Sequence, residues 1–144
     1  MNNWQSMGRH RYRRERDILL LETHGEILLP DMQQLVSQLE ALFGEHGHGL
    51  LLSDIHGGLS IGVAARRLVL EGFLKDHADD FLNAVVGATT LSRGLIALFL
   101  GALRMLFKKT TNVQFFDTEA EAISWLTTQG QRLSAQKKRR GQSP

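Results

Sequence analysis

Short apolar runs alternate with amphipathic segments along most of this chain, and this alternation restricts its fold more than any other feature. Four runs have the length and composition of buried strands, at residues 18–21, 49–54, 81–88 and 112–116. A segment of helical length follows each run. A strand, a helix and another strand connect most simply as a parallel crossover, so the order predicts an α/β domain with a mixed, mostly parallel sheet and about four helices.

The opening run predicts one antiparallel pairing at the N-terminal side of the sheet. Ile18 to Leu21 are continuously apolar, as in a strand that is covered on both faces. Residues 9–16 are predicted to form an edge strand that pairs with residues 17–23. Helices on both faces of the sheet would explain why its central strands lack a strict two-residue alternation.

Local signals predict where the helices begin. Pro30 suits the first turn of a helix, and Ser60 is predicted to cap the second helix with its side-chain oxygen. Thr89, Thr90 and Ser92 offer caps for a third helix that extends to about Lys109. Thr118 and Glu121 have the spacing of a capping box, which predicts the start of the last helix.

The length of 144 residues suits one domain with a real core. We expect a flexible N-terminus at residues 1–8, a domain at residues 9–128 and a disordered basic tail at residues 129–144, where the composition is too polar to bury a core. The absence of cysteine excludes disulfides and thiolate chemistry. No apolar signal core follows the polar N-terminus, so a cytoplasmic location is expected, with peripheral contact to a membrane as an extension.

Charge is distributed unevenly along the chain. The first 16 residues carry five arginines and one glutamate, and residues 129–144 carry five basic residues. The remaining 112 residues carry seven basic and fourteen acidic side chains. The basic ends are able to attract nucleic acid or anionic lipid, or simply to keep the chain soluble, and no aromatic residues interleave the "KKRR" run. Because the body of the domain is acidic, a nucleic-acid partner is not expected.

The stretch "LLLSDIHGGLS" at residues 50–60 is the first candidate site. In an open parallel sheet, ligands bind beyond the carboxyl ends of the strands, and free amides at a helix start attract anions. On this interpretation the loop residues Asp54, His56, Gly57, Gly58 and Ser60 hold a ligand or contact a partner. On the alternative interpretation the glycines only permit the turn, the serine caps, and the remaining side chains bond nearby backbone.

No motif in the chain predicts chemistry. The loop is neither a P-loop nor a dinucleotide fingerprint. The pairs His46-x-His48 and Asp54-x-His56 have no established zinc spacing, and no nucleophile, base and orienting group form a recognisable set. We therefore expect no metal, no cofactor and no catalytic residue.

The third helix is the second candidate site. Arg93, Arg104 and Lys108 fall in one sector of about 100° on a helical wheel, and the other faces are nearly all apolar. One interpretation is a buried helix with a narrow wetted stripe. The other places the surface at residues 98–107 beside a cavity, a dimer seam or a lipid interface, where Arg104 and Lys108 would attract anionic groups.

Three segments carry a resemblance to a known family. They are the opening strand and turn "ILLLETHGEI", the strand and glycine-containing loop that begin with "GLLLSD", and the closing "VQFFDTEAEAISWL". Together with the order of elements, over residues 9–128, they resemble the SpoIIAA-like proteins of the STAS superfamily, which are also compared with the CRAL-TRIO lipid-binding fold.

The resemblance implies a regulatory or ligand-binding role. Superfamily members that act as anti-sigma antagonists carry a phosphorylatable serine in an Asp-Ser-Ser-Gly-Leu-like loop. The comparable loop here, "DIHGGLS", lacks that motif, so the resemblance implies no phosphorylation switch. The lipid-binding comparison implies an apolar ligand or an association with membranes.

Two functions follow from these observations. The first is a non-enzymatic module that binds an apolar or amphiphilic small ligand, or a membrane surface, through the third helix and the loop at residues 54–60. The second is a regulatory protein-interaction domain of STAS type that acts through the same loop. A homodimer is compatible with either function.

Overall fold

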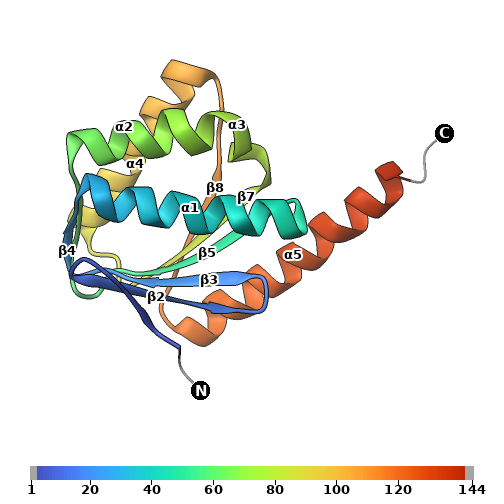
Figure 1. Ribbon diagram of the computed structural model, residues 1–144, viewed down its shortest axis with the longest axis horizontal. Coiled ribbons are helices and arrows are strands. Elements are labelled where there is room, and N and C mark those ends of the chain that lie inside the picture. The colour runs from blue at the N-terminus through green and yellow to red at the C-terminus, as the bar shows by residue number, and fades with distance from the viewer. Residues whose placement is uncertain (1–2, 142–144) are drawn as a thin grey trace.

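The computed structural model describes residues 3–141, and its centre is a six-stranded sheet with helices on both faces (Figure 1). The strands are β1 (Gln5–Met7), β2 (His10–Glu15), β3 (Ile18–Glu22), β4 (Gly25–Ile27), β5 (Gly49–Asp54), β6 (Leu59–Ile61), β7 (Phe81–Val86) and β8 (Asn112–Phe116). The helices are α1 (Leu29–His46), α2 (Val63–Val69), the π-helical turn η1 (Leu70–Leu74), α3 (Lys75–His77), the 3₁₀ turn η2 (Ala78–Asp80), α4 (Thr90–Phe107) and α5 (Glu119–Gly141).

The sheet is mixed, as the sequence predicts. Its strand order is β1-β2-β3-β5-β7-β8, and β4 and β6 form a separate two-stranded parallel pair. The first three strands pair antiparallel, whereas β3, β5, β7 and β8 are parallel neighbours. The predicted α/β class, the N-terminal antiparallel pairing and the parallel remainder are therefore confirmed.

Two apolar cores occupy the two faces of the sheet. Leu19, Leu21 and Leu51 pack on one face with α1, α2, η1 and Leu103 of α4. Ile18, Leu20, Leu50 and Leu52 point to the other face, where α5 supplies buried residues. Successive side chains of a strand point to opposite faces, so a strand covered on both sides is apolar throughout.

The N-terminal segment differs from its prediction. Residues 5–7 form β1 and pair with β2, so β2 is an inner strand rather than the edge, and the ordered domain begins before residue 9. Met7 is fully buried in the core beside α1. The ladder, Met7 and side-chain bonds from Tyr12 to Gln5 and from Gln34 to Ser6 hold a segment that has no strand-like composition of its own.

The basic C-terminal segment also differs from its prediction. Residues 129–141 continue α5, which projects past the end of α1 in Figure 1, where the sequence predicts a disordered tail. Gly130 lets α5 approach the sheet, since a Cβ at that position would lie 2.8 Å from Leu50 Cδ1. Leu133 packs on the second core, and the ammonium group of Lys137 lies at Gly47, the C-terminal cap of α1. These contacts extend the helix beyond what its polar composition predicts; residues 142–144 of the predicted tail lie outside the described residues.

The second helix begins later than predicted. Ser60 is an exposed residue of β6 and caps nothing, while Gly62 is the N-cap of α2. The pairing of β6 with β4 takes Ser60 into a strand, opposite Glu26. A ladder between segments far apart in sequence overrides the local capping preference of serine.

Candidate functional site

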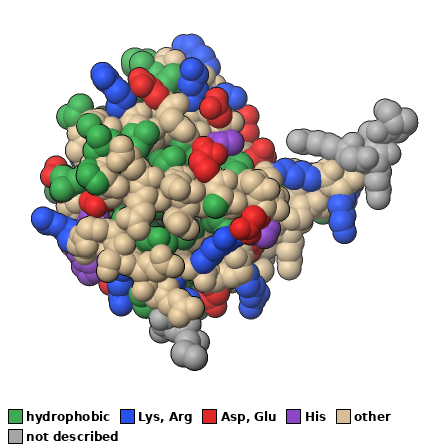
Figure 2. Space-filling model, in the orientation of Figure 1, with side chains coloured by type: hydrophobic (Ala, Val, Ile, Leu, Met, Phe, Trp, Pro, Cys, Tyr) green, Lys and Arg blue, Asp and Glu red, His purple; other side chains and the backbone are tan. Residues whose placement is uncertain are grey.

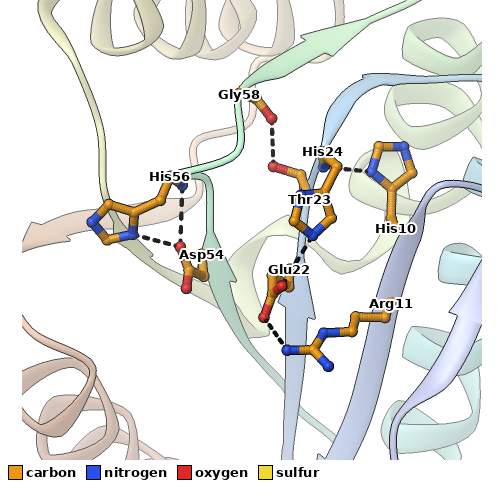
Figure 3. A network of polar contacts seen from close by, with 8 residues as sticks. All are labelled: His10, Arg11, Glu22, Thr23, His24, Asp54, His56 and Gly58. Atoms are coloured by element: carbon orange, nitrogen blue, oxygen red, sulfur yellow. Dashed lines mark hydrogen bonds and ion pairs between the residues drawn. The ribbon is translucent and has the colours of Figure 1, made fainter.

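The carboxyl ends of β3, β5 and β7 lie side by side at one edge of the sheet. Glu22 and Asp54 end their strands in register, and Asp54 is in register with Val86 at the end of β7. The loops that follow carry His24 and His56 (Figure 3). We call Glu22, His24, Asp54 and His56 the strand-end rim. It contains the predicted loop residues Asp54 and His56 and two residues that the sequence reasoning missed.

Asp54 orients His56 at the tip of the β5 loop. One carboxylate oxygen accepts hydrogen bonds from the backbone amide of His56 at 3.1 Å and from its Nδ1 at 2.7 Å. A carboxylate only accepts, so Nδ1 carries a proton, and Nε2 is the ring nitrogen left for another partner. The His56 side chain is 66% exposed, and this nitrogen is therefore available at the surface.

Glu22 and His24 form a second carboxylate–imidazole pair one strand away, joined through Nε2 of the ring rather than Nδ1. The sequence "ETHG" at residues 22–25 matches "DIHG" at residues 54–57 in its acid-x-His-Gly order, and this repeat is the signal that could have identified the second pair. His24 Nε2 lies 3.0 Å from the Glu22 carboxylate. The Arg11 guanidinium, which donates to Glu22 at 2.9 Å, holds the pKa of that carboxyl below its usual 4.5 against the opposing effect of burial. The Glu22 carboxylate is therefore ionised, and Arg11 balances its charge.

Both imidazole rings pack against glycine residues. A Cβ at Gly57 would lie 2.5 Å from the Thr23 carbonyl oxygen and 2.6 Å from His24 Nδ1. A Cβ at Gly87, just after β7, would lie 2.6 Å from the His56 ring. Each ring thus packs against the glycine that follows the neighbouring strand: His24 against Gly57, and His56 against Gly87. Gly58 has a different role, because its φ of +98° is a turn conformation that favours glycine.

Hydrogen bonds fix the loop backbone below the rim. The Thr23 amide donates to the Asp54 carbonyl at 3.0 Å, and the Thr23 hydroxyl donates to the Gly58 carbonyl at 2.7 Å. The buried His10 ring accepts at Nδ1 from the His24 amide at 2.9 Å (Figure 3). At Nε2 the ring donates to the Glu26 carbonyl, also at 2.9 Å. The two loops therefore form one rigid edge, and His10, which the sequence reasoning also missed, anchors it.

The remaining predicted site residues lie elsewhere. α4 starts beside the rim, but it is about 27 Å long, and Arg104 and Lys108 lie near its far end. Both are exposed there, next to Lys109, which bonds Asp79 just before β7. The helix crosses the sheet and carries these two cations toward the edge opposite the loop at residues 54–60.

α4 lies exposed on the helical layer rather than buried within it. Only 11% of its residues are buried, which rules out the interpretation as a core helix. Among the residues that the structure describes, the large apolar side chains of α4 that are exposed are Leu91, Leu95, Leu98, Met105 and Leu106. Figure 2 shows apolar side chains with basic ones beside them at the top and left of the helical layer. By length and composition alone, α4 is the one helix among residues 3–141 that could cross a membrane.

An apolar cavity of about 310 Å³ lies between α4 and the sheet. Its floor is formed by β3, β5, β7 and β8, and its walls by α1, α2, the β6 strand and α4. The polar side chains in its lining are Thr23, Ser53, Ser60, Arg66, Asn83 and Thr111. Ser60 is the one predicted site residue that lines this cavity. Residues 98–100 and 102 of α4 also line it, in agreement with the alternative that placed residues 98–107 beside a cavity.

The rim and the cavity are suited to binding. Within residues 3–141, no group of three or more His, Asp or Glu side chains is arranged to hold a metal ion. The rim offers one carboxylate–imidazole pair on each of two rigid loops, which favours recognition of hydrogen-bonding and charged groups. The cavity offers shape and apolar surface.

Sheet, helices and strand-end rim together define an α/β domain with carboxylate and imidazole side chains at the carboxyl ends of its parallel strands. The chain belongs to the SpoIIAA-like family, whose model matches residues 18–127. The predicted resemblance is confirmed by this match. A search of curated proteins finds no match.

Two solved structures have a similar fold. One is an uncharacterised protein of the DUF3478 family with a SpoIIAA-like fold, from Shewanella loihica PV-4, with 21% identity and a TM-score of 0.57. The similarity covers 80% of this chain and 90% of that one. The other is a putative anti-sigma factor antagonist from Thermotoga maritima, with 15% identity, a TM-score of 0.50 and coverage of 81% and 92%.

Proposed function

We propose that this chain is a non-enzymatic regulatory domain that binds a protein partner through the strand-end rim. The support is membership of the SpoIIAA-like family and a fold similar to that of a putative anti-sigma factor antagonist, a description that implies a protein target. The observation that carries the proposal is the rim itself. Two carboxylate–imidazole pairs reach the surface from loops that hydrogen bonds hold together. A partner that binds them would therefore cause little loss of conformational entropy in these loops.

Quantitative affinity purification from the source cells tests this role. Bait carrying Glu22→Gln and His56→Ala removes both kinds of rim group and leaves the loop glycines in place. We expect a partner that is enriched on the wild-type chain to fall about tenfold or more on the double variant, because central polar contacts contribute about 2 kcal/mol each.

The matched control is Asp76→Asn, an exposed carboxylate of α3 at the opposite edge of the sheet. It should retain the partner. A partner that is kept by the rim variant and lost by Asp76→Asn would place the interface elsewhere and refute the proposal.

A second candidate function is the binding of an apolar or amphiphilic small ligand. The specific observation is the cavity beneath α4, whose volume is twice the roughly 150 Å³ that accommodates benzene in an apolar cavity. Native mass spectrometry of protein purified from cells should show added mass that disappears after denaturation. Only the mass of the bare chain, in repeated preparations, would count against a retained ligand.

Association with a membrane surface is the third part of the proposal. Leu98 and Met105 are 74% and 75% exposed, and Arg104 and Lys108 lie on the same helix. We expect flotation with anionic vesicles that weakens at high salt and is lost in Leu98→Glu. The control Lys138→Glu changes charge on α5 without touching α4, and equal losses in both variants would indicate nonspecific charge attraction.

A further inference from the structure

Two polar side chains stand on the otherwise apolar floor of the cavity. Ser53 belongs to β5 and Asn83 to β7, and both point to the face that α4 covers. The Ser53 hydroxyl donates to the Asn83 side-chain oxygen at 2.9 Å. Their neighbours on the same face are Leu51 and Val85, which are buried. Ser53 is buried and Asn83 is half-buried, so the pair is reached from the cavity rather than sealed inside the core.

Counting donors shows that the pair is incomplete. The asparagine amide carries two N–H donors and the serine one O–H donor, and the pair uses one of the three between its members. Two donors remain whichever way the amide is turned. No residue in the described chain accepts from the Asn83 amide nitrogen. The hydroxyls of Thr23 and Thr111, in contrast, are occupied by backbone carbonyls, each at 2.7 Å.

The spare donors face a space that is large enough for a molecule. Because Asn83 is half-buried, water can reach these donors through the cavity, and a bound acceptor of matching geometry would take the place of that water. Scaling from benzene in about 150 Å³, a cavity of this volume accommodates about a dozen non-hydrogen atoms. The occupant must therefore be small, largely apolar and able to accept hydrogen bonds at one point.

The charge of the lining restricts the occupant further. Arg66 is the one charged residue of the lining, and it is exposed on α2 rather than placed on the floor. A carboxylate at Ser53 and Asn83 would be buried without a counter-charge, which is strongly unfavourable. A neutral acceptor such as a ketone, ester or amide carbonyl avoids this cost.

We propose that the cavity binds a small apolar molecule through a neutral carbonyl group, which accepts hydrogen bonds from Asn83 and Ser53. This inference rests on the second candidate function, the binding of an apolar ligand in the cavity. It adds the chemical class of the ligand and the two residues that select it. Asn83 supplies the donors, and Ser53 holds the amide in place.

Three probes of equal size separate the possibilities. Benzylacetone carries a ketone, hydrocinnamate a carboxylate, and isopentylbenzene only carbon, on the same phenyl-ethyl frame. Affinities are measured by calorimetry on the full-length chain and on the variants Asn83→Leu, Ser53→Ala and Asn112→Ala. Asn112 is an exposed asparagine of β8 that does not line the cavity, and its variant is the control.

Asn83→Leu is expected to weaken benzylacetone about tenfold, the equivalent of one lost hydrogen bond, while isopentylbenzene binds as before or more tightly. Ser53→Ala is expected to weaken benzylacetone about threefold, and it keeps the test decisive if Asn83→Leu does not fold. Asn112→Ala should match the wild type for every probe. Hydrocinnamate should bind more weakly than benzylacetone at neutral pH.

Three results would overturn the inference. Equal losses for benzylacetone and isopentylbenzene in the variants would leave an apolar site with no carbonyl selection. Tighter binding of hydrocinnamate than of benzylacetone would show that the site takes an anion. No binding of any probe to the wild type would indicate a cavity that holds only water, and would remove the ligand-binding function together with the inference.

Discussion

Replacing Leu103 by alanine is expected to lower the free energy of unfolding by about 3 kcal/mol, the lower part of the range for a buried leucine. Leu103 is 0% exposed and is the one apolar residue of α4 that is fully buried in the first core. The other α4 side chains on that core, Phe99, Ala102 and Phe107, are only partly buried. Arg93 also stacks on the Phe115 ring at 4.5 Å. The substitution should therefore loosen α4 over the cavity.

Leu98→Ala is the matched control for this prediction. The chemical change is the same and the helix is the same, but Leu98 is 74% exposed. We expect a change within about 0.5 kcal/mol, the range for surface positions. Urea unfolding, with hydrogen exchange of the α4 amides, measures both effects. Similar losses in the two variants would contradict the anchoring of α4 through Leu103.

Replacing Gly57 by valine is expected to cost about 3 kcal/mol, near the upper end of ordinary point substitutions. The new Cβ would lie 2.5 Å from the carbonyl oxygen of Thr23. That oxygen cannot retreat easily, because Thr23 is fully buried and bonded at both its amide and its hydroxyl. The strand-end rim should therefore distort together with the loss of stability, and the NMR signals of the His24 and His56 rings would report this.

Gly101→Ala provides the comparison. Gly101 is an exposed residue within α4, and a Cβ there would meet nothing within 4 Å. Alanine in a helix interior is favoured over glycine by about 1 kcal/mol, so this variant should be more stable than the wild type. If Gly57→Val left the free energy of unfolding unchanged, the two strand-end loops would not be held as closely as the structure indicates.

Local signals predicted several elements because the interactions they depend on lie within a few residues. The start of the last helix is one case, where the N-cap half of the predicted capping box is present. The Thr118 hydroxyl lies 2.8 Å from the Glu121 carboxylate and accepts from its amide at 3.2 Å. The strand β3 is another, since its unbroken apolar run predicted coverage on both faces. Ser60 failed as a cap because its strand pairing with β4 depends on a segment more than thirty residues earlier.

The candidate site was only partly predictable for the same reason. Asp54 and His56 follow a strand in sequence, and the bond between them is local. Glu22 joins them through sheet register, and His10 contacts the rim at His24, fourteen residues along the chain. Asn83 stands in "FLNAVV" as a polar interruption of an apolar strand, a signal that acquires meaning only when the cavity above it is known.

By itself, the amino-acid order determined the layered class of the domain, the sequence of strands and helices and the turn at Gly57 and Gly58, because hydrophobic periodicity and backbone sterics act over short distances. Only the tertiary structure decided which loops meet at the rim, that α4 lies exposed above a cavity, and that α5 extends to Gly141. Those features depend on packing between segments far apart in the chain, and such packing outweighs local propensity.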